Sequence, residues 1–243
     1  MKPYLWIAYD YSSISQCIAM LDLILEKYPD EDIIHGIGRP TLLQAAIEGV
    51  PLVAEFRKRL NNNQMLVADF KGYDVPYIAE GRFYYRAGTD LVTVMATAPN
   101  EAIQEAINGA NIEQKQVAFD LMACLDDDWK VKRAQELADL GASLVSCHTG
   151  WSEQAVGKKP NLLIRKVCQQ LKHTSTKVIA TGGLKPSNLK DLKPYVEQIF
   201  AIAVGSAITR SNNPQATIAQ FQLEINQLNL PLLSNAPWAA IER

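Results

Sequence analysis

The sequence predicts a (β/α)8 barrel, and three observations support that fold class. Short apolar runs alternate with segments of helical character eight times over about 225 residues, the rhythm of strand-then-helix units. Neither a linker nor a low-complexity tract divides the 243 residues, a length that α/β barrels routinely use as one domain. The first strand runs into Asp10-Tyr11-Ser12, whereas the competing architecture, a doubly wound open sheet, usually has a glycine-rich turn there.

The predicted strands are continuous apolar runs, as expected of parallel strands that are buried on both faces. They cover residues 4–9, 32–35, 65–69, 91–94, 117–121, 144–147, 177–181 and 199–204. With their helices they predict one barrel domain over residues 1–228. We expect residues 229–243 to form a C-terminal tail packed on the barrel.

The predicted helices are bounded by residues that favour helix ends. Ser12 or Ser13 can cap the first helix, Gly109 and Gly141 are placed as helix stops, and the acids 126–128 favour a helix start. The helices cover residues 14–28, a stretch beginning at 41, then 76–87, 99–108, 126–140, 160–172, 188–195 and 214–228.

Composition argues against several classes of partner. The formal net charge is -2 and no long run of either sign occurs, which speaks against non-specific nucleic-acid or membrane-surface binding but allows a small phosphorylated ligand. No stretch approaches 18 consecutive apolar residues, and the amino terminus lacks a signal-peptide pattern. The cysteines form no C-x-x-C pair, which predicts buried thiols in a reducing compartment. They are Cys17, Cys124, Cys147 and Cys168. We therefore predict a cytoplasmic protein.

The third predicted strand ends in three ionisable residues, Asp69, Lys71 and Asp74. Residues two apart in a strand point the same way, so Asp69 and Lys71 share one side at its carboxyl end. A lysine beside carboxylates is held as the ammonium, which can donate a proton to a carbanion or stabilise an enolate. A surface salt bridge is the alternative, but the buried strand leading into these residues favours a site.

In a (β/α)8 barrel the active site lies at the carboxyl ends of the strands. Polar or conformationally permissive residues fall at seven of these ends: Asp10, His35, Asp69 with Lys71, Asp120, His148, Thr181 with Gly182-Gly183, and Gly205-Ser206. The two glycine turns follow strands seven and eight, the customary phosphate position, where backbone N–H groups bind anions. Tight turns without a ligand are the alternative.

Several of these residues also have a structural interpretation. Asp10 can cap the first helix, Asp120 can pair with a lysine, and His35 can be a core histidine. His148 is better placed for chemistry, because Thr149-Gly150 opens a polar loop.

These residues resemble the orotidine 5′-monophosphate decarboxylase superfamily, whose signature is Asp-x-Lys-x-x-Asp at the end of the third strand. Four further segments strengthen the resemblance over residues 5–223: 91–94, His148-Thr149-Gly150 with 154–157, 181–184 and 205–209. In order and spacing they resemble the branch containing 3-hexulose-6-phosphate synthase and 3-keto-L-gulonate-6-phosphate decarboxylase. The resemblance implies a carbon–carbon lyase that acts on a phosphorylated keto sugar through an enediolate.

The resemblance also implies roles for individual residues. Asp69 would bind Mg2+, Lys71 would lie beside the enediolate oxygen, and His148 would assist proton transfer. Asp74 would reach into the partner's site of a homodimer. The remaining residues would contact substrate, with phosphate at the glycine turns: Asp10, Asp120, Thr181, Gly182, Gly183, Gly205 and Ser206.

Two departures from the family pattern keep alternatives open. At the end of strand two this branch usually has a glutamate, and this chain has His35 there, so we expect Asp69 and His35 as metal ligands, with a different, displaced or absent ion. Ser206 replaces an arginine common in the gulonate decarboxylases, which favours the synthase pattern. The alternatives are an orotidine 5′-phosphate decarboxylase and a divergent, non-catalytic barrel that binds a sugar phosphate.

Overall fold

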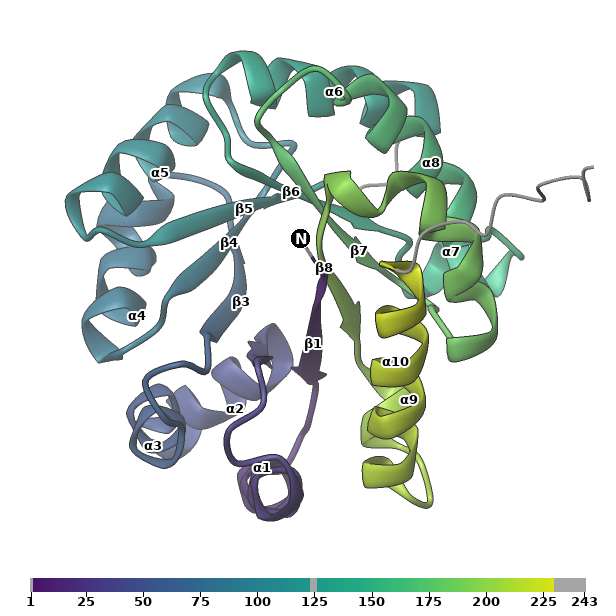
Figure 1. Cartoon of the computed structure of the whole chain (residues 1–243). Coiled ribbons are helices and arrows are strands. Elements are labelled where there is room, and N and C mark those ends of the chain that lie inside the picture. The colour runs from purple at the N-terminus through teal and green to yellow at the C-terminus, as the bar shows by residue number, and fades with distance from the viewer. Residues whose placement is uncertain (1, 123–125, 230–243) are drawn as a thin grey trace, which may run out of the picture.

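The computed structural model describes residues 2–122 and 126–229, and they form a closed barrel of eight parallel strands in chain order (Figure 1). The strands are β1 (Tyr4–Tyr9), β2 (Ile33–Gly38), β3 (Leu66–Gly72), β4 (Leu91–Met95), β5 (Gln116–Asp120), β6 (Leu144–His148), β7 (Lys177–Thr181) and β8 (Ile199–Val204). Closure occurs between β1 and β8, where Tyr4 pairs with Ala201 and Ile7 with Val204. The (β/α)8 prediction is confirmed.

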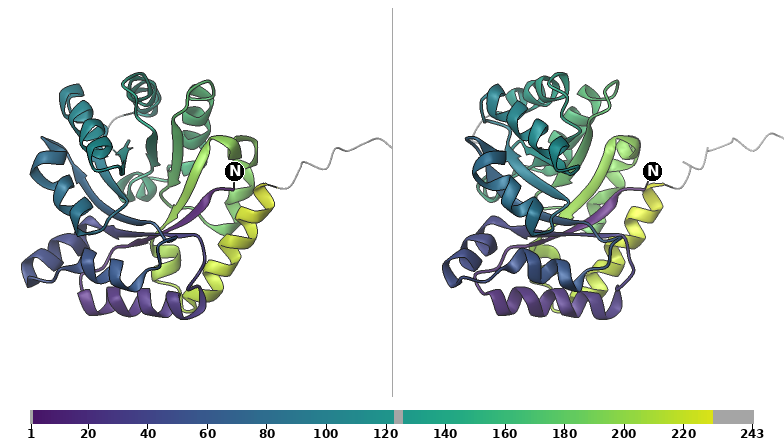
Figure 2. Two further views of the ribbon diagram at one scale, coloured as in Figure 1. Left: turned by 60° about the vertical axis from the view of Figure 1, so that its left-hand side comes forward. Right: turned by 90° about the vertical axis from the view of Figure 1, so that its left-hand side faces the viewer.

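Helices surround the barrel, and the last one lies beside the first, so the two ends of the fold are neighbours (Figures 1 and 2). The α-helices are α1 (Ile14–Lys27), α2 (Arg39–Glu48), α3 (Leu52–Arg59), α4 (Arg82–Ala87), α5 (Asn100–Ile112), α6 (Asp127–Asp139), α7 (Trp151–Ala155), α8 (Pro160–Gln170), α9 (Ser206–Thr209) and α10 (Pro214–Leu228). A π-helical turn, η1 (Tyr77–Gly81), precedes α4, and a 3-10 segment, η2 (Pro186–Gln198), precedes β8. Ser13 caps α1, as one of the two predicted candidates.

Two predicted boundaries are wrong for identifiable reasons. Gly109 does not end its helix: α5 continues to Ile112, and the missing side chain makes room for the Tyr77 ring, which a Cβ at this position would overlap. The segment beginning at residue 41 is two helices, because Gly49 adopts a left-handed φ of 68° and Pro51 opens α3.

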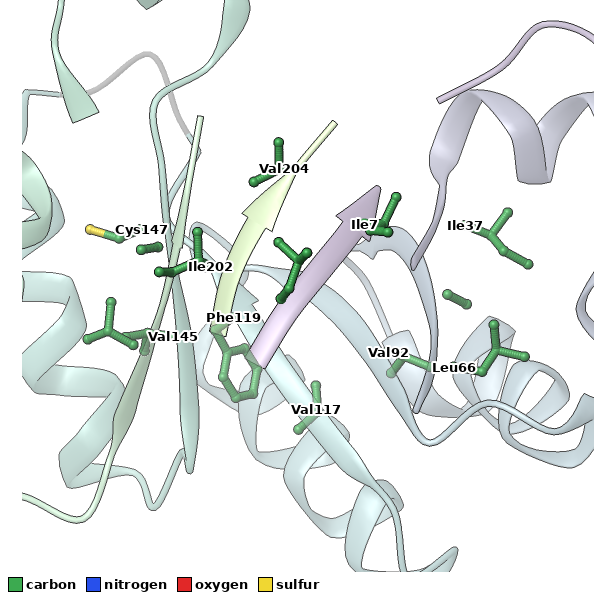
Figure 3. Close-up of a cluster of buried hydrophobic side chains, with 14 of the residues drawn as sticks. Ile7, Ile37, Leu66, Val92, Val117, Phe119, Val145, Cys147, Ile202 and Val204 are labelled. Atoms are coloured by element: carbon green, nitrogen blue, oxygen red, sulfur yellow. The ribbon is translucent and has the colours of Figure 1, made fainter. Parts of the chain in front are cut away.

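Side chains alternate between two buried layers along each strand. The outer layer, between strands and helices, includes Ile7, Val92, Phe119, Val145 and Ile202 (Figure 3). The inner layer fills the barrel interior with Trp6, Ile34, Val67, Leu91, Ala118, Leu144, Ile179, Ala201 and Ala203. This alternation decides which residues at the strand ends can reach a central pocket.

Some predictions concern parts of the chain that the structure covers incompletely. Cys124 and the tail from residue 230 lie outside the described residues, so their predicted burial and packing stay predictions. Cys17, Cys147 and Cys168 are buried free thiols, as expected. Among the described helices, none combines the length and apolar character that a membrane crossing requires.

Candidate active site

A pocket lies at the carboxyl ends of the strands, lined by inward-facing side chains and by the turns that follow β6, β7 and β8. It brings together ten of the predicted site residues: Asp10, Asp69, Lys71, Asp120, His148, Thr181, Gly182, Gly183, Gly205 and Ser206. Asp74 and His35 do not line it. Thr93, Gln154, Trp151 and Arg210 line it as well and were not predicted as site residues.

Lys71 is the centre of the ionic network in this pocket. Its Nζ lies 2.9 and 3.0 Å from the two carboxylate oxygens of Asp69 and 2.7 Å from Oδ2 of Asp120. The register of β3 shifts between Ala68 and Gly72, and Lys71 has a φ of 55°, in the left-handed region that disfavours side chains. The Lys71 N–H donates to Thr93 Oγ1 at 3.1 Å, which helps to hold this conformation. Such conformations concentrate at functional sites.

Lys71 and Asp120 each stabilise the charged form of the other. Burial alone disfavours the ammonium, but Asp120 and Asp69 hold the pKa of Lys71 well above its usual value. Burial alone would raise the pKa of Asp120, whose side chain is 2% exposed, but Lys71 and His148 hold that pKa far below its usual range. Both groups are therefore ionised throughout the neutral pH range.

His148 is oriented by the same carboxylate. Its Nδ1 lies 3.1 Å from Asp120 Oδ2, and because that carboxylate only accepts hydrogen bonds, Nδ1 is the donor. The second ring nitrogen, Nε2, makes no hydrogen bond with the residues that the structure describes. The backbone N–H of Met122 donates to the other Asp120 oxygen at 2.8 Å and fixes the carboxylate.

Asp10 faces Lys71 from the end of β1. Burial raises its pKa, and the nearby Asp69 carboxylate raises it further, while Lys71 acts in the opposite direction. Gly38 makes this position possible, since a Cβ there would overlap the Asp10 carboxylate. Asp10 is not a helix cap, because Ser13 caps α1, and its predicted contact with substrate hydroxyls stays a prediction.

The turns after β7 and β8 form the opposite side of the pocket. Gly182 and Gly183 have φ values of 93° and 76°, which few other residues adopt. The backbone N–H groups of Gly182, Gly183, Gly205 and Ser206 donate to no acceptor in the described part of the chain. Free N–H groups on the lining of a pocket suit an anion.

Arg210 adds a cation to this side of the pocket. Its guanidinium lies 5.2 Å from the centre of the Trp151 ring, within cation–π range. Within the described ranges it makes no ion pair with a carboxylate. Sequence reasoning missed Arg210, although it follows Ser206 by four residues, one helical turn, and this spacing was the available signal.

The predicted pairing of His35 with Asp69 on a metal is wrong. Alternation along β2 turns His35 outward, where it is 0% exposed, stacks on Tyr9 and shares a 2.9 Å hydrogen bond between its Nδ1 and the Tyr9 hydroxyl. The Phe56 ring of α3 packs edge-on against Tyr9. The core interpretation of His35 is therefore the correct one.

Burial of His35 makes the free energy of unfolding depend on pH in the acidic range. Burial, with a contribution from Arg57, lowers its pKa from 6.5 to about 3. Below pH 6.5 the unfolded chain takes up a proton that the folded chain refuses, so stability falls as pH decreases from 6.5 towards 3. We expect a loss of about 2 kcal/mol between pH 7 and pH 5 from this residue. Urea unfolding of wild type and His35→Leu across this pH range measures the loss. An equal dependence of the unfolding free energy on pH in the two proteins would contradict the prediction.

Asp74 lies apart from the pocket of its own chain. It is exposed, as are its neighbours Tyr73 and Val75, which are 53% and 45% exposed. Its predicted role in a partner's site stays a prediction.

Comparisons with known proteins agree with the fold and show the family. A family model described as Orotidine 5'-phosphate decarboxylase / HUMPS family matches residues 3–221. The chain is 32% identical over 190 residues to 3-hexulose-6-phosphate synthase of Staphylococcus haemolyticus, covering 78% of this chain and 83% of that protein. It is 30% identical over 203 residues to 3-hexulose-6-phosphate synthase 1 of Staphylococcus saprophyticus, covering 84% and 91%.

Solved structures give the same picture. The structure of 3-hexulose-6-phosphate synthase from Salmonella typhimurium matches with a TM-score of 0.78 and 26% identity over 93% of this chain and 99% of that one. A structure of KGPDC from Streptococcus mutans matches with a TM-score of 0.80 and 22% identity over 95% and 100%, which supports the fold alone.

Proposed function

We propose a sugar-phosphate lyase reaction for this chain, which belongs to the Orotidine 5'-phosphate decarboxylase / HUMPS family. It is an enzyme, a lyase of the type represented by 3-hexulose-6-phosphate synthase. Its proposed reaction is an aldol addition that joins formaldehyde to ribulose 5-phosphate, because the relatives at 30% identity or more carry the synthase name. Decarboxylation of a 3-keto sugar acid phosphate is the second candidate, since both reactions pass through an enediolate.

One observation carries the proposal: the Lys71 ammonium lies between two carboxylates in a pocket whose other side offers free N–H groups and Arg210. A sugar phosphate fits this polarity, with its phosphate at Gly182, Gly183, Gly205 and Ser206. Its keto end then lies towards Lys71, and its hydroxyls towards Asp10. Phosphate binding supplies the energy that positions the reacting carbon.

The proposed chemistry uses these groups in order. A base, with His148 Nε2 as the candidate, removes a proton from the carbon next to the ketone, and the electron pair moves onto oxygen to form an enediolate. The Lys71 ammonium stabilises that oxyanion in a partly buried site, where electrostatic interactions are strong. The enediolate carbon then attacks formaldehyde, a carbon–carbon bond forms, and the new alkoxide takes a proton.

Product analysis tests the proposal directly. The full chain is incubated with ribulose 5-phosphate and formaldehyde, and the six-carbon ketose phosphate is followed by mass spectrometry. We expect product from the phosphorylated sugar and none from ribulose, which lacks the binding group. Release of CO2 from a 3-keto sugar acid phosphate instead would select the second candidate. Binding of ribulose 5-phosphate without turnover of either substrate would identify a non-catalytic barrel.

Arg210→Ala tests the phosphate end of the pocket. Losing a charge-assisted contact to a phosphate costs about 1.5–3 kcal/mol, so KM for the phosphorylated substrate should rise about 10-fold or more while kcat changes little. Arg86→Ala is the matched control, because Arg86 is exposed on α4 and pairs with Glu113 away from the pocket. An unchanged KM in Arg210→Ala would remove this residue from the phosphate site.

A homodimer with shared sites is part of the proposal, supported by the exposed position of Asp74 and by the exposed apolar residues around it, including Val75 and Ile78. Lys71→Ala and Asp74→Ala should each be inactive as pure dimers. When the two variants are refolded together in equal amounts, half of the dimers are mixed, and each mixed dimer contains one intact site of its two. About a quarter of wild-type activity should therefore return. A mixture as inactive as its components, with mixed dimers shown by mass spectrometry, would contradict a shared site.

The proposed location is the cytoplasm, supported by the three buried free thiols. Cell fractionation with an antibody against the chain tests it.

A further inference from the structure

The two inward-facing positions near the carboxyl end of β2 carry no side chains. Ile34 faces the barrel interior and Ile33 and Ile37 face the helices, so Gly36 and Gly38 are the residues of β2 that face inward at the pocket end of the barrel. His35 faces outward with Tyr9. β2 therefore supplies no side-chain oxygen or nitrogen ligand beside Asp69, although Gly38 pairs directly with Asp69 in the sheet.

Side chains from β1 occupy the space that β2 leaves. A Cβ on Gly36 would overlap Nε1 of the Trp6 indole and lie 2.7 Å from its Cε2, and one on Gly38 would overlap Asp10. Trp6 is 4% exposed and belongs to the inner layer of the core, so its ring is fixed there. No carboxylate can stand at position 36 while this ring is present.

The carboxylates that remain are already engaged. Oδ1 of Asp69 accepts from Lys71 and from Thr93, the latter at 2.6 Å, and Oδ2 accepts from Lys71. Oδ1 of Asp120 accepts from the Met122 N–H, and Oδ2 accepts from Lys71 and His148. All four oxygens thus have donors, and the cation they surround is the Lys71 ammonium.

The Mg2+ ion that the resemblance implies does not fit this donor set. Mg2+ requires oxygen ligands in octahedral geometry, and within residues 2–122 and 126–229 no three His, Cys, Asp or Glu side chains are grouped to hold a metal. Asp10 is the pocket carboxylate to which no described N–H or O–H donates, and one such group does not complete a site.

We propose that this enzyme works without a divalent cation: the Trp6 indole fills the place of a ligand from β2, and the Lys71 ammonium is the sole cation at the developing oxyanion. The inference deepens the proposed function and rests on it for the identity of the oxyanion. Trp6 is a positioning residue. Its ring excludes a carboxylate from the floor of the pocket, and Asp69 therefore pairs with Lys71.

Mn2+ binding tests the inference without reference to activity. Electron paramagnetic resonance of free Mn2+, titrated with the full wild-type chain, should show no site tighter than about 1 mM. The double variant Trp6→Leu/Gly36→Glu removes the ring and adds an inward-facing carboxylate opposite Val67, two residues before Asp69 on β3. It should gain a Mn2+ site that Asp69→Asn abolishes. A tight Mn2+ site in the wild type, lost in Asp69→Asn or Asp10→Asn, would overturn the inference whether or not the double variant folds.

Activity separates this inference from the proposed function. Wild-type turnover of ribulose 5-phosphate and formaldehyde should be the same, within about two-fold, after extensive dialysis against EDTA and after addition of Mg2+. Turnover that disappears in EDTA and returns with Mg2+ would refute metal independence and leave the lyase assignment intact. Absence of turnover under all conditions would refute the lyase assignment, while the Mn2+ titration would still decide the metal question.

Discussion

Lys71→Ala should lower kcat/KM for the phosphorylated keto sugar by at least about 10³-fold, because it removes the cation that stabilises the developing oxyanion. Substrate should still bind, since the glycine turns and Arg210 are untouched. Steady-state kinetics gives the loss, and calorimetry with ribulose 5-phosphate shows that binding remains. A variant with full activity would refute the proposed mechanism.

Stability is the control that this experiment needs. Removing Lys71 leaves the buried Asp120 without its main partner, which costs about 3–5 kcal/mol when a buried pair is broken. Lys71→Ala/Asp120→Asn removes the orphaned charge and should recover most of this loss without recovering activity. Lys115→Ala is the matched lysine control: Lys115 pairs with Asp90 at 2.8 Å outside the pocket, so activity should stay within about two-fold of wild type.

Gly182→Ala should lower kcat/KM by about 10²-fold through displacement of the turn after β7. A Cβ at this position would overlap the Thr149 carbonyl oxygen and lie 2.7 Å from the Thr149 nitrogen, and buried backbone can yield only by moving the turn. The free N–H groups of Gly182 and Gly183 would then be displaced from the proposed phosphate site. Kinetics with the phosphorylated substrate measures the effect.

Gly141→Ala separates this displacement from backbone strain. Gly141 has a φ of 92°, close to the 93° of Gly182, but a Cβ there meets nothing within 4 Å. Both variants should lose about 1–2 kcal/mol of stability from the left-handed conformation. Only Gly182→Ala should lose activity, and equal kinetic losses in the two variants would assign the effect to strain alone.

The fold was predictable because each strand of a parallel barrel is a buried apolar run with a nearby helix boundary. The Asp69/Lys71 arrangement was predictable for a related reason: ionisable residues that follow a buried strand must lie at its end, where barrels place their sites. The contacts of Lys71 with Asp120 could not be predicted from the sequence, because they depend on β3, β4 and β5 lying side by side in the barrel.

The misplacement of His35 has a specific cause. Sequence reasoning ended the second strand at His35 and so placed His35 at the strand end, but β2 continues to Gly38. That extension puts Gly36 and Gly38 on the pocket side and His35 on the helix side, since faces alternate with a period of two. Glycines are weak strand signals, and the structure shows why they occur here: the Trp6 ring lies against Gly36 and the Asp10 carboxylate against Gly38.

A crystal structure grown with ribulose 5-phosphate and Mg2+ would show whether the pocket holds its substrate as proposed. We predict phosphate at the N–H groups of Gly182, Gly183, Gly205 and Ser206, a keto oxygen within hydrogen-bond distance of Lys71 Nζ, and no ion between Asp69 and β2. A sugar phosphate bound elsewhere, or its keto end turned away from Lys71, would contradict the proposed mechanism.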